Sequence, residues 1–445
     1  MKHSISIAGL ACACCLGLSA TAGAQTTSGR SPSARPWSRI SFFTNSSQLR
    51  TIDGQARSFN ELTTTFTAQM PELEGNGFEY GVDVRFSAYS ASTRPERTSI
   101  YEGFVGGRFA NGSIGVRAGH MWLNDIGSLG SVAGGAVEIR QTRSDPEGGR
   151  FRAVAFAGLE PDILDTGYAS NVKKYGGYLA YDGSGARRHV IGTVLVRNAS
   201  IAERSVLTAT NYIPVRQKLF IYQTLEYDMR PPAEQAASGL AYFFLTGHVT
   251  ANERLEIQGT YNRGRSIDAR SISEDVLAGR PLSTRAVEGF LYETMGGRVT
   301  VEVAPRIRIY TGYARDKNNR DAAQTARILL GGYAGNIGGS GLDLTASDSL
   351  FDQPTGRYHS QYVSIGRQLG RSVYASGDYS TSLSVIRFSR SDGIIVETRP
   401  HTSRFSGTAS RNVGRSVSLL TTVERTSDDQ THDLRLLSGI TYRTR

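Results

Sequence analysis

The residue types that most often carry catalysis or bind metals are present, but their spacing matches no catalytic or metal-binding motif. The serines form no G-x-S-x-G nucleophile motif, since GGSG at 338–341 has the wrong spacing. No H-E-x-x-H is present, and no two of the later histidines stand at metal-ligand spacing. Those histidines are His120, His189, His248, His359, His401 and His432. The sequence therefore predicts no enzyme, no cofactor and no metal site, although groups from distant strands could still assemble one.

A glycine-rich stretch, GSLGSVAGG at 127–135, raises the question of a phosphate-binding loop. It lacks both G-x-G-x-x-G and G-x-x-x-x-G-K-[ST], and no helical pattern follows it. We therefore assign these glycines to a connection over 123–131 and to the strand that follows it. The pattern favours a hairpin loop that projects outward over one that folds inward as a constriction. The residues of that alternative constriction are Asn124, Asp125, Gly127 and Gly130.

Arginine dominates the charge of the chain. Lysine and arginine total 50 against 40 acidic residues, and 45 of the 50 are arginine. The arginines stand singly along the whole sequence and form no basic cluster, so we expect no nucleic-acid partner.

The elements that would hold these side chains are strands with one apolar and one polar face. Residues 77–88, GFEYGVDVRFSA, alternate apolar and polar over a dozen positions. The same period of two recurs at 254–262, 306–314 and 434–443. It predicts long amphipathic strands.

The connections between these strands are of two kinds. Short turns rich in Gly, Asn and Pro stand at 110–113, 182–185, 251–254, 304–306, 369–371 and 413–415. Longer connections are expected at 123–131, 160–171, 229–237, 265–291 and 317–357. The two kinds alternate along the chain, which is typical of a membrane barrel with short turns at one end and long loops at the other.

Backbone polar groups in lipid must all be paired, so a sheet can span a bilayer only when it closes on itself. The strands have the roughly 9 to 11 residues needed to cross. We therefore predict an all-β fold, a closed antiparallel transmembrane β-barrel of about 20 strands, within a range of 16 to 22. Soluble β proteins share the alternation, but a propeller would repeat a motif and a sandwich array would show domain boundaries, and neither is seen.

The N-terminus predicts export. Residues 1–24 combine Lys2, an apolar run and Ala22-Gly23-Ala24, as in a cleaved signal peptide. All three cysteines fall at 12–15, so the mature chain has none, which favours a bacterial envelope protein over a disulfide-rich secreted one. We expect a signal peptide at 1–24, a periplasmic linker at 25–37 and the barrel at 38–445.

The leader, the Cys-free mature chain, the tyrosine-rich strands and turns such as APRIRIYTGY resemble Gram-negative outer-membrane β-barrel proteins, and more loosely the porin-like members. The resemblance covers nearly all of residues 38–445. It implies a bacterial outer-membrane location, outer-membrane lipid as surroundings and the barrel assembly machinery as a partner. Many such proteins end on an aromatic residue, whereas this chain ends TYRTR.

The function expected of such a barrel is passive diffusion of small hydrophilic solutes, with a mild anion preference. The alternatives are a non-conducting surface barrel whose loops bind a partner, and an outer-membrane enzyme; a homo-oligomer is left open. Loops 265–291 and 317–357 are candidates to constrict or plug the lumen. Arginines on the polar faces would line the pore, either to select anions or to form ion pairs with acids on the same faces. They are Arg85, Arg117, Arg140, Arg197, Arg298, Arg308 and Arg435.

Overall fold

The computed structural model describes residues 36–444, apart from 71–74, 91–93, 143–147, 163–165, 216–217, 231–232, 234–237, 322, 354–355 and 390–394. The expected signal peptide and nearly all of the expected linker lie outside the described residues. The first strand begins at Trp37, one residue before the expected start of the barrel.

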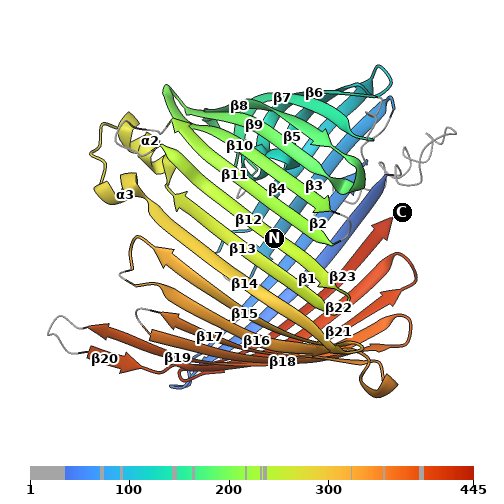
Figure 1. Cartoon of the computed structure of the whole chain (residues 1–445), viewed down its shortest axis with the longest axis vertical. Coiled ribbons are helices and arrows are strands. Elements are labelled where there is room, and N and C mark those ends of the chain that lie inside the picture. The colour runs from blue at the N-terminus through green and yellow to red at the C-terminus, as the bar shows by residue number, and fades with distance from the viewer. Residues whose placement is uncertain are drawn as a thin grey trace.

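The described residues form one closed antiparallel sheet in which, apart from β20 and β21, each strand pairs with its neighbours in sequence, as Figure 1 shows. The strands are β1 (Trp37–Thr51), β2 (Ala56–Gln69), β3 (Gly77–Tyr89), β4 (Arg97–Phe109), β5 (Ile114–Trp122), β6 (Ser131–Arg140), β7 (Arg150–Pro161), β8 (Tyr168–Asp182), β9 (Arg188–Asn198), β10 (Ile201–Val215), β11 (Leu219–Arg230), β12 (Gly239–Asn252), β13 (Leu255–Ser266), β14 (Phe290–Ala304), β15 (Ile307–Asn318), β16 (Thr325–Ala334), β17 (Leu342–Gln353), β18 (Gly356–Leu369), β19 (Val373–Ser389), β20 (Ile395–Thr398), β21 (His401–Val413), β22 (Val417–Asp428) and β23 (Thr431–Thr444).

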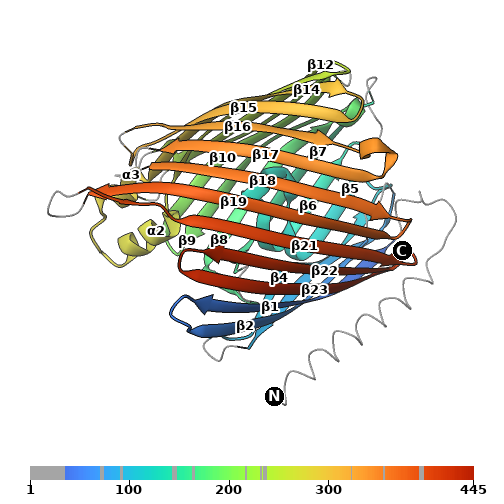
Figure 2. The same cartoon turned by 90° about the horizontal axis from the view of Figure 1, so that it is seen from below.

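The barrel closes where β1 pairs with β23, from Ser38 opposite Thr444 to Thr51 opposite Thr431. Figure 2 shows these two strands side by side. The short β20 pairs with β19 beyond the point where β21 takes over, so β20 and β21 act as one interrupted strand. The described wall thus has 22 strands, which confirms the closed antiparallel barrel at the top of the expected range.

The sequence predicted about 20 strands, two fewer than the barrel has, and the difference has one source. The segment 317–357 was expected to be a single long loop, but it contains β16 and β17 and their turns. In β17, LDLTASDSLFDQ, polar residues interrupt the apolar face, so the alternation that identifies the other strands is blurred. The expectation that 317–357 constricts or plugs the lumen is therefore wrong.

The two ends of the barrel differ. We call the end that holds Trp37 and Thr444 the terminal rim, and the opposite end the distal rim. Because the strands run alternately up and down, all six short turns expected from the sequence lie at the terminal rim. The longest connection, 267–289, lies at the distal rim and contains α2 (Ala269–Leu277) and α3 (Thr284–Glu288). In Figure 1 these two helices mark the distal rim at the left.

The two faces of the wall follow the alternation of the sequence. On β5, Ile114, Val116 and Trp122 are 42%, 42% and 39% exposed, whereas Met121 on the other face is 1% exposed. We call the first face outward and the second lumenal. Most large apolar side chains of the outward face stay exposed all round the barrel, as expected of a surface that meets lipid.

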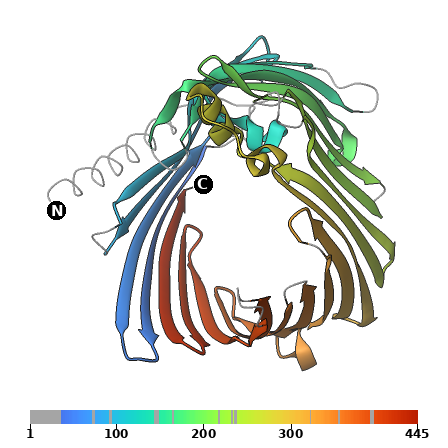
Figure 3. The ribbon, with the colours of Figure 1, turned by 90° about the vertical axis from the view of Figure 1, so that its left-hand side faces the viewer.

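Two segments fold inside the barrel on the side formed by β3 to β11. One is the short helical turn η3 (Asn124–Gly130), and the other is α2, which contacts β9 and β10. Figure 3, which looks into the barrel, shows both within the ring of strands. Around η3 lies a buried apolar cluster that includes Ile126, Leu129, Val132 and Val194. No helix in the described part of the chain is long and apolar enough to cross a membrane.

Glycines permit a close approach of strands at the base of this cluster. Gly134 on β6 pairs with Gly158 on β7, and a Cβ at Gly134 would lie 2.1 Å from the carbonyl oxygen of Ala157. A Cβ at Gly158 would lie 2.3 Å from the carbonyl oxygen of Ala133. Only glycine fits at this contact.

Candidate functional site

The candidate site is the lumen. The side of the lumen that η3 and α2 occupy is held together by ion pairs. Glu79 accepts a hydrogen bond from Nε of Arg117 at 2.8 Å, and its carboxylate lies 3.6 Å from Nε of Arg108. Arg108 in turn meets Glu138 at 3.0 Å, and Glu138 also receives Arg140 at 2.8 Å. The side chains of Arg108 and Glu79 are 0% and 2% exposed. Charges buried this deeply are stable only when they are paired, so this network fixes the wall from β3 to β6.

The expected constriction loop takes part in a second network. Asp125 of η3 accepts Arg152 of β7 through Nη1 at 3.0 Å and also contacts Arg188 of β9. Both arginines are shared with Asp182, at 2.8 Å from Arg152 and 3.4 Å from Arg188. These contacts attach a connection from the distal rim to the parts of β7, β8 and β9 near the terminal rim.

The favoured outward projection of 123–131 is therefore wrong, and the inward alternative is found. Ile126 and Leu129 are 2% and 4% exposed, and Gly127 adopts a φ of 57° that favours glycine. A Cβ at Gly130 would lie 2.1 Å from the carbonyl oxygen of Leu123, so the loop can close only with glycine there. Asn124 stays exposed, on the free side of the turn.

The distal helix α2 is held in a similar way. Arg270 donates through Nε to Glu203 of β10 at 2.6 Å and also contacts Glu160 of β7. Burial opposes the charged form of Arg270, but hydrogen bonds and charge attraction from these carboxylates raise its pKa above the ordinary value. Ser273, fully buried, receives a hydrogen bond from Asn198 Nδ2 at 3.0 Å. The expectation that 265–291 narrows the lumen agrees with this docking.

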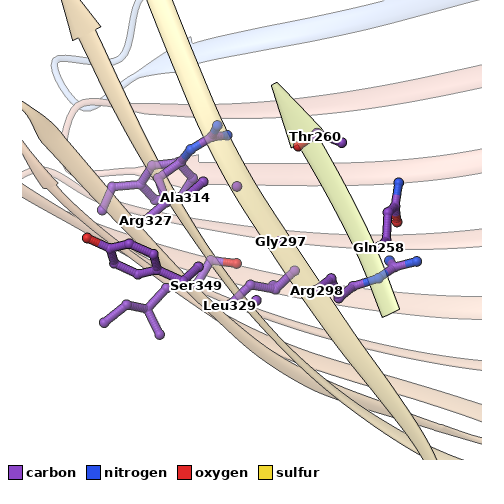
Figure 4. Close-up of a pocket in the computed structure, with 13 residues that line it drawn as sticks. Gln258, Thr260, Gly297, Arg298, Ala314, Arg327, Leu329 and Ser349 are labelled. Carbon is purple, nitrogen blue, oxygen red and sulfur yellow. The ribbon is translucent and has the colours of Figure 1, made fainter. Parts of the chain in front are cut away.

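The opposite side of the lumen, formed by β13 to β18, is lined mostly by half-buried side chains, with Arg298 and Arg308 exposed. A pocket of about 260 Å³ opens there between Arg298 and Arg327, as Figure 4 shows. The pocket exists because small residues on the lumenal face leave space, among them Gly296, Gly312 and Ser349. Its walls are mixed polar and apolar.

The two arginines of this pocket differ in their partners. Arg327 is paired with Asp316 at 2.8 Å. Arg298 lies over the ring of Tyr310, with 5.7 Å between Cζ and the ring centroid, and forms no ion pair with any described residue. Arg298 is therefore a cation of the open side whose charge no neighbouring carboxylate offsets.

Five more of the arginines expected to line the pore also lie on the lumenal face, and each has an acidic neighbour. The pairs are Arg85 with Glu61 at 3.5 Å, Arg117 with Glu79 at 2.8 Å, Arg140 with Glu138 at 2.8 Å, Arg308 with Glu302 at 3.4 Å, and Arg435 with Asp433 at 2.8 Å. The sequence left two roles open for these arginines, anion selection or ion pairing within the wall. For these five, ion pairing describes the structure better.

Arg197 departs from the expectation. It lies on the face of β9 that carries the exposed Ile191, whereas Val194 and Asn198 face the lumen. Its guanidinium donates to the carbonyl oxygen of Ser200 in the adjoining turn. Side chains alternate between the two faces of a strand, and Val194 and Val196 are buried on the lumenal face. Counting from these valines places Arg197 on the outward face.

Several residues that form ion pairs inside the barrel were not singled out from the sequence. Arg108, Arg152, Lys174 and Arg270 each meet acids from strands or helices distant in sequence. The sequence does show opposite charges on the same face of neighbouring strands. Which of them pair depends on the register of the strands, which the sequence does not show. Among the described residues no three His, Asp, Glu or Cys side chains gather closely enough to hold a metal ion.

No family model and no curated protein matches the sequence. Among solved structures the chain is similar to OccK2 (OpdF) of Pseudomonas aeruginosa, with 10% identity and a TM-score of 0.44 over 92% of this chain and 98% of that one. It is also similar to OpdQ of Pseudomonas aeruginosa, with 8% identity and a TM-score of 0.43 over 92% and 99%. OccAB3 of Acinetobacter baumannii gives 8% and 0.42 over 92% and 100%. At this low similarity, the function must be argued from the barrel itself.

Proposed function

We propose that the protein is an outer-membrane channel for passive diffusion of small hydrophilic solutes. The observation that carries the proposal is the division of the lumen. The described inner segments, η3 and α2, pack against the side formed by β3 to β11, whereas the lumenal face of β13 to β18 carries polar side chains that stay at least partly exposed, among them Arg298 and Arg308. Barrels of more than about 16 strands are wide enough to hold an aqueous channel unless they are plugged.

The outer membrane is the location that fits the outward face. Its exposed apolar side chains alternate with the polar lumenal ones, and the longest connection, 267–289, lies at the distal rim. Both features are those of bacterial outer-membrane barrels, and the leader-like residues 1–24 supply the route to the envelope. The terminal rim would then face the periplasm and the distal rim the exterior.

A mild preference for anions is part of the proposal and rests on Arg298. Most lumenal arginines are neutralised by carboxylates, whereas Arg298 faces the pocket without one among the described residues. An uncompensated cation beside a conducting path attracts anions and repels cations. The formal charge of the whole chain, +10, has the same sign.

Conductance of the refolded protein in planar bilayers tests the channel. We expect step-like single-channel currents, and a reversal potential in a salt gradient that favours anions. A membrane that stays silent over repeated insertions would contradict the channel and favour the second candidate, a surface barrel whose distal loops bind a partner. The ordered helices α2 and α3 at the distal rim are the feature that favours that second candidate. A reversal potential that favours cations would contradict the anion preference alone.

A further inference from the structure

A group of cations lies on the outward face at the distal ends of β13 and β15. Arg263 on β13 and Lys317 on β15 both pair in register with Glu293 of the intervening β14. Arg315, two residues before Lys317, pairs with Met295 and shares the same face. Arg263, Arg315 and Lys317 are all exposed. We call these three residues the rim cations.

The rim cations differ from most of the lumenal arginines, which form ion pairs with carboxylates. None of the three forms an ion pair with a residue in the described ranges, and Glu293 accepts a hydrogen bond from the hydroxyl of Tyr261 at 3.1 Å. Beside them, Arg265 has two guanidinium nitrogens, Nε and Nη2, that are enclosed without a hydrogen-bond partner. The surface thus holds more donors than the protein itself uses.

The rim cations border the apolar belt directly. On β14 and β15 the outward positions below them are Val299, Met295, Ile309 and Tyr313, which are 38%, 58%, 46% and 50% exposed. Six residue steps along β15 separate Ile307 from Tyr313, so this belt is about 20 Å long at roughly 3.3 Å per residue. An outward cation just past the end of such a belt lies at the level of lipid headgroups.

We infer that the rim cations bind the phosphate groups of an anionic lipid in the bilayer leaflet at the distal rim. This inference rests on the membrane location in the proposed function, but not on conductance. Arg263 and Lys317 lie on either side of Glu293, two strand spacings or roughly 10 Å apart. Arg315 lies beside Met295 on the same face. Guanidinium and ammonium groups suit phosphate oxygens, while the neighbouring apolar side chains suit the acyl chains.

The test compares a triple variant with a matched control. The variant is R263Q/R315Q/K317Q. The control, R367Q/R411Q/R415Q, removes three exposed arginines at the terminal rim, two on the outward face of β18 and β21 and one in the following turn. Each purified protein is titrated in detergent with dimyristoyl phosphatidic acid, and the bound lipid is counted by native mass spectrometry. Inorganic phosphate at the same concentrations is the second probe.

We expect the native protein and the control to bind the lipid equally, and the triple variant about 100-fold more weakly, since each basic group near an anionic surface contributes about 1 kcal/mol. Equal binding by the triple variant would overturn the inference, and so would full competition by inorganic phosphate, which would show a free-ion site. Heat-modifiable migration on gels confirms that each variant is folded. Because lipid binding is measured without current, a silent channel would refute the proposed function and leave this inference standing.

Discussion

The inward loop η3 gives the sharpest prediction, because one carboxylate, that of Asp125, forms ion pairs with two arginines of the wall. Asp125→Ala removes the carboxylate that Arg152 and Arg188 share. The apolar contacts of Ile126 and Leu129 remain, so we expect the loop to stay docked most of the time but to open far more often.

The size of the effect follows from burial. Breaking a buried ion pair costs about 3 to 5 kcal/mol. The side chain of Arg188 is 42% exposed and Arg152 keeps Asp182 at 2.8 Å, so the loss is smaller here, about 2 to 3 kcal/mol. Since 1.36 kcal/mol is a factor of ten, the open population should rise roughly 30- to 150-fold.

Cysteine labelling measures this population. Native cysteines occur only at 12–15, so a mature chain that begins near Gln25 offers none. Ile126→Cys, at a position 2% exposed, should react with a maleimide only when the loop opens. Its labelling rate should rise roughly 30- to 150-fold in the Asp125→Ala background. Asn124→Cys, at an exposed position, is the control and should label at the same rate in both backgrounds.

The result that would refute this reasoning is an Ile126→Cys labelling rate that Asp125→Ala does not change. The apolar cluster alone would then hold the loop, and the ion pairs would add nothing. Fast labelling of Ile126→Cys in the native background would contradict the docked loop itself.

Three further predictions concern the lumen and its walls. Arg298→Gln should lower the anion-to-cation permeability ratio by up to about fivefold. This is the effect of removing one charge that lies about 5 Å from the passing ion, in water and with the screening of 0.1 M salt. An unchanged reversal potential would contradict this prediction. Gly134→Val should prevent folding or lower the unfolding temperature strongly, because a Cβ there meets the Ala157 carbonyl oxygen at 2.1 Å; native-like heat-modified migration would show the contact to be adaptable. Arg270→Ala should release α2 and speed tryptic cleavage after the exposed Arg285 of α3 about tenfold, and an unchanged cleavage rate would mean that Ser273 and Ile272 suffice to hold the helix.

The sequence by itself determined the class of fold. Period-two alternation reports which side chains share a face, and this information is local, so the two faces of β3 follow directly from the alternation at 77–88. The six short turns are local as well, and all of them lie at one rim. Where alternation was weak, in β17, the strand and its neighbour were taken for a loop.

Only the tertiary structure decided the direction of η3 and the partners of the charges. Asp125 is separated from Arg188 by 63 residues, and Arg270 from Glu160 by 110. Such pairs depend on strand register and on which loop has room inside the barrel, and neither is written in the residues themselves. The same holds for the distinction between a lumenal arginine neutralised by a carboxylate, such as Arg435, and one left facing a pocket, such as Arg298.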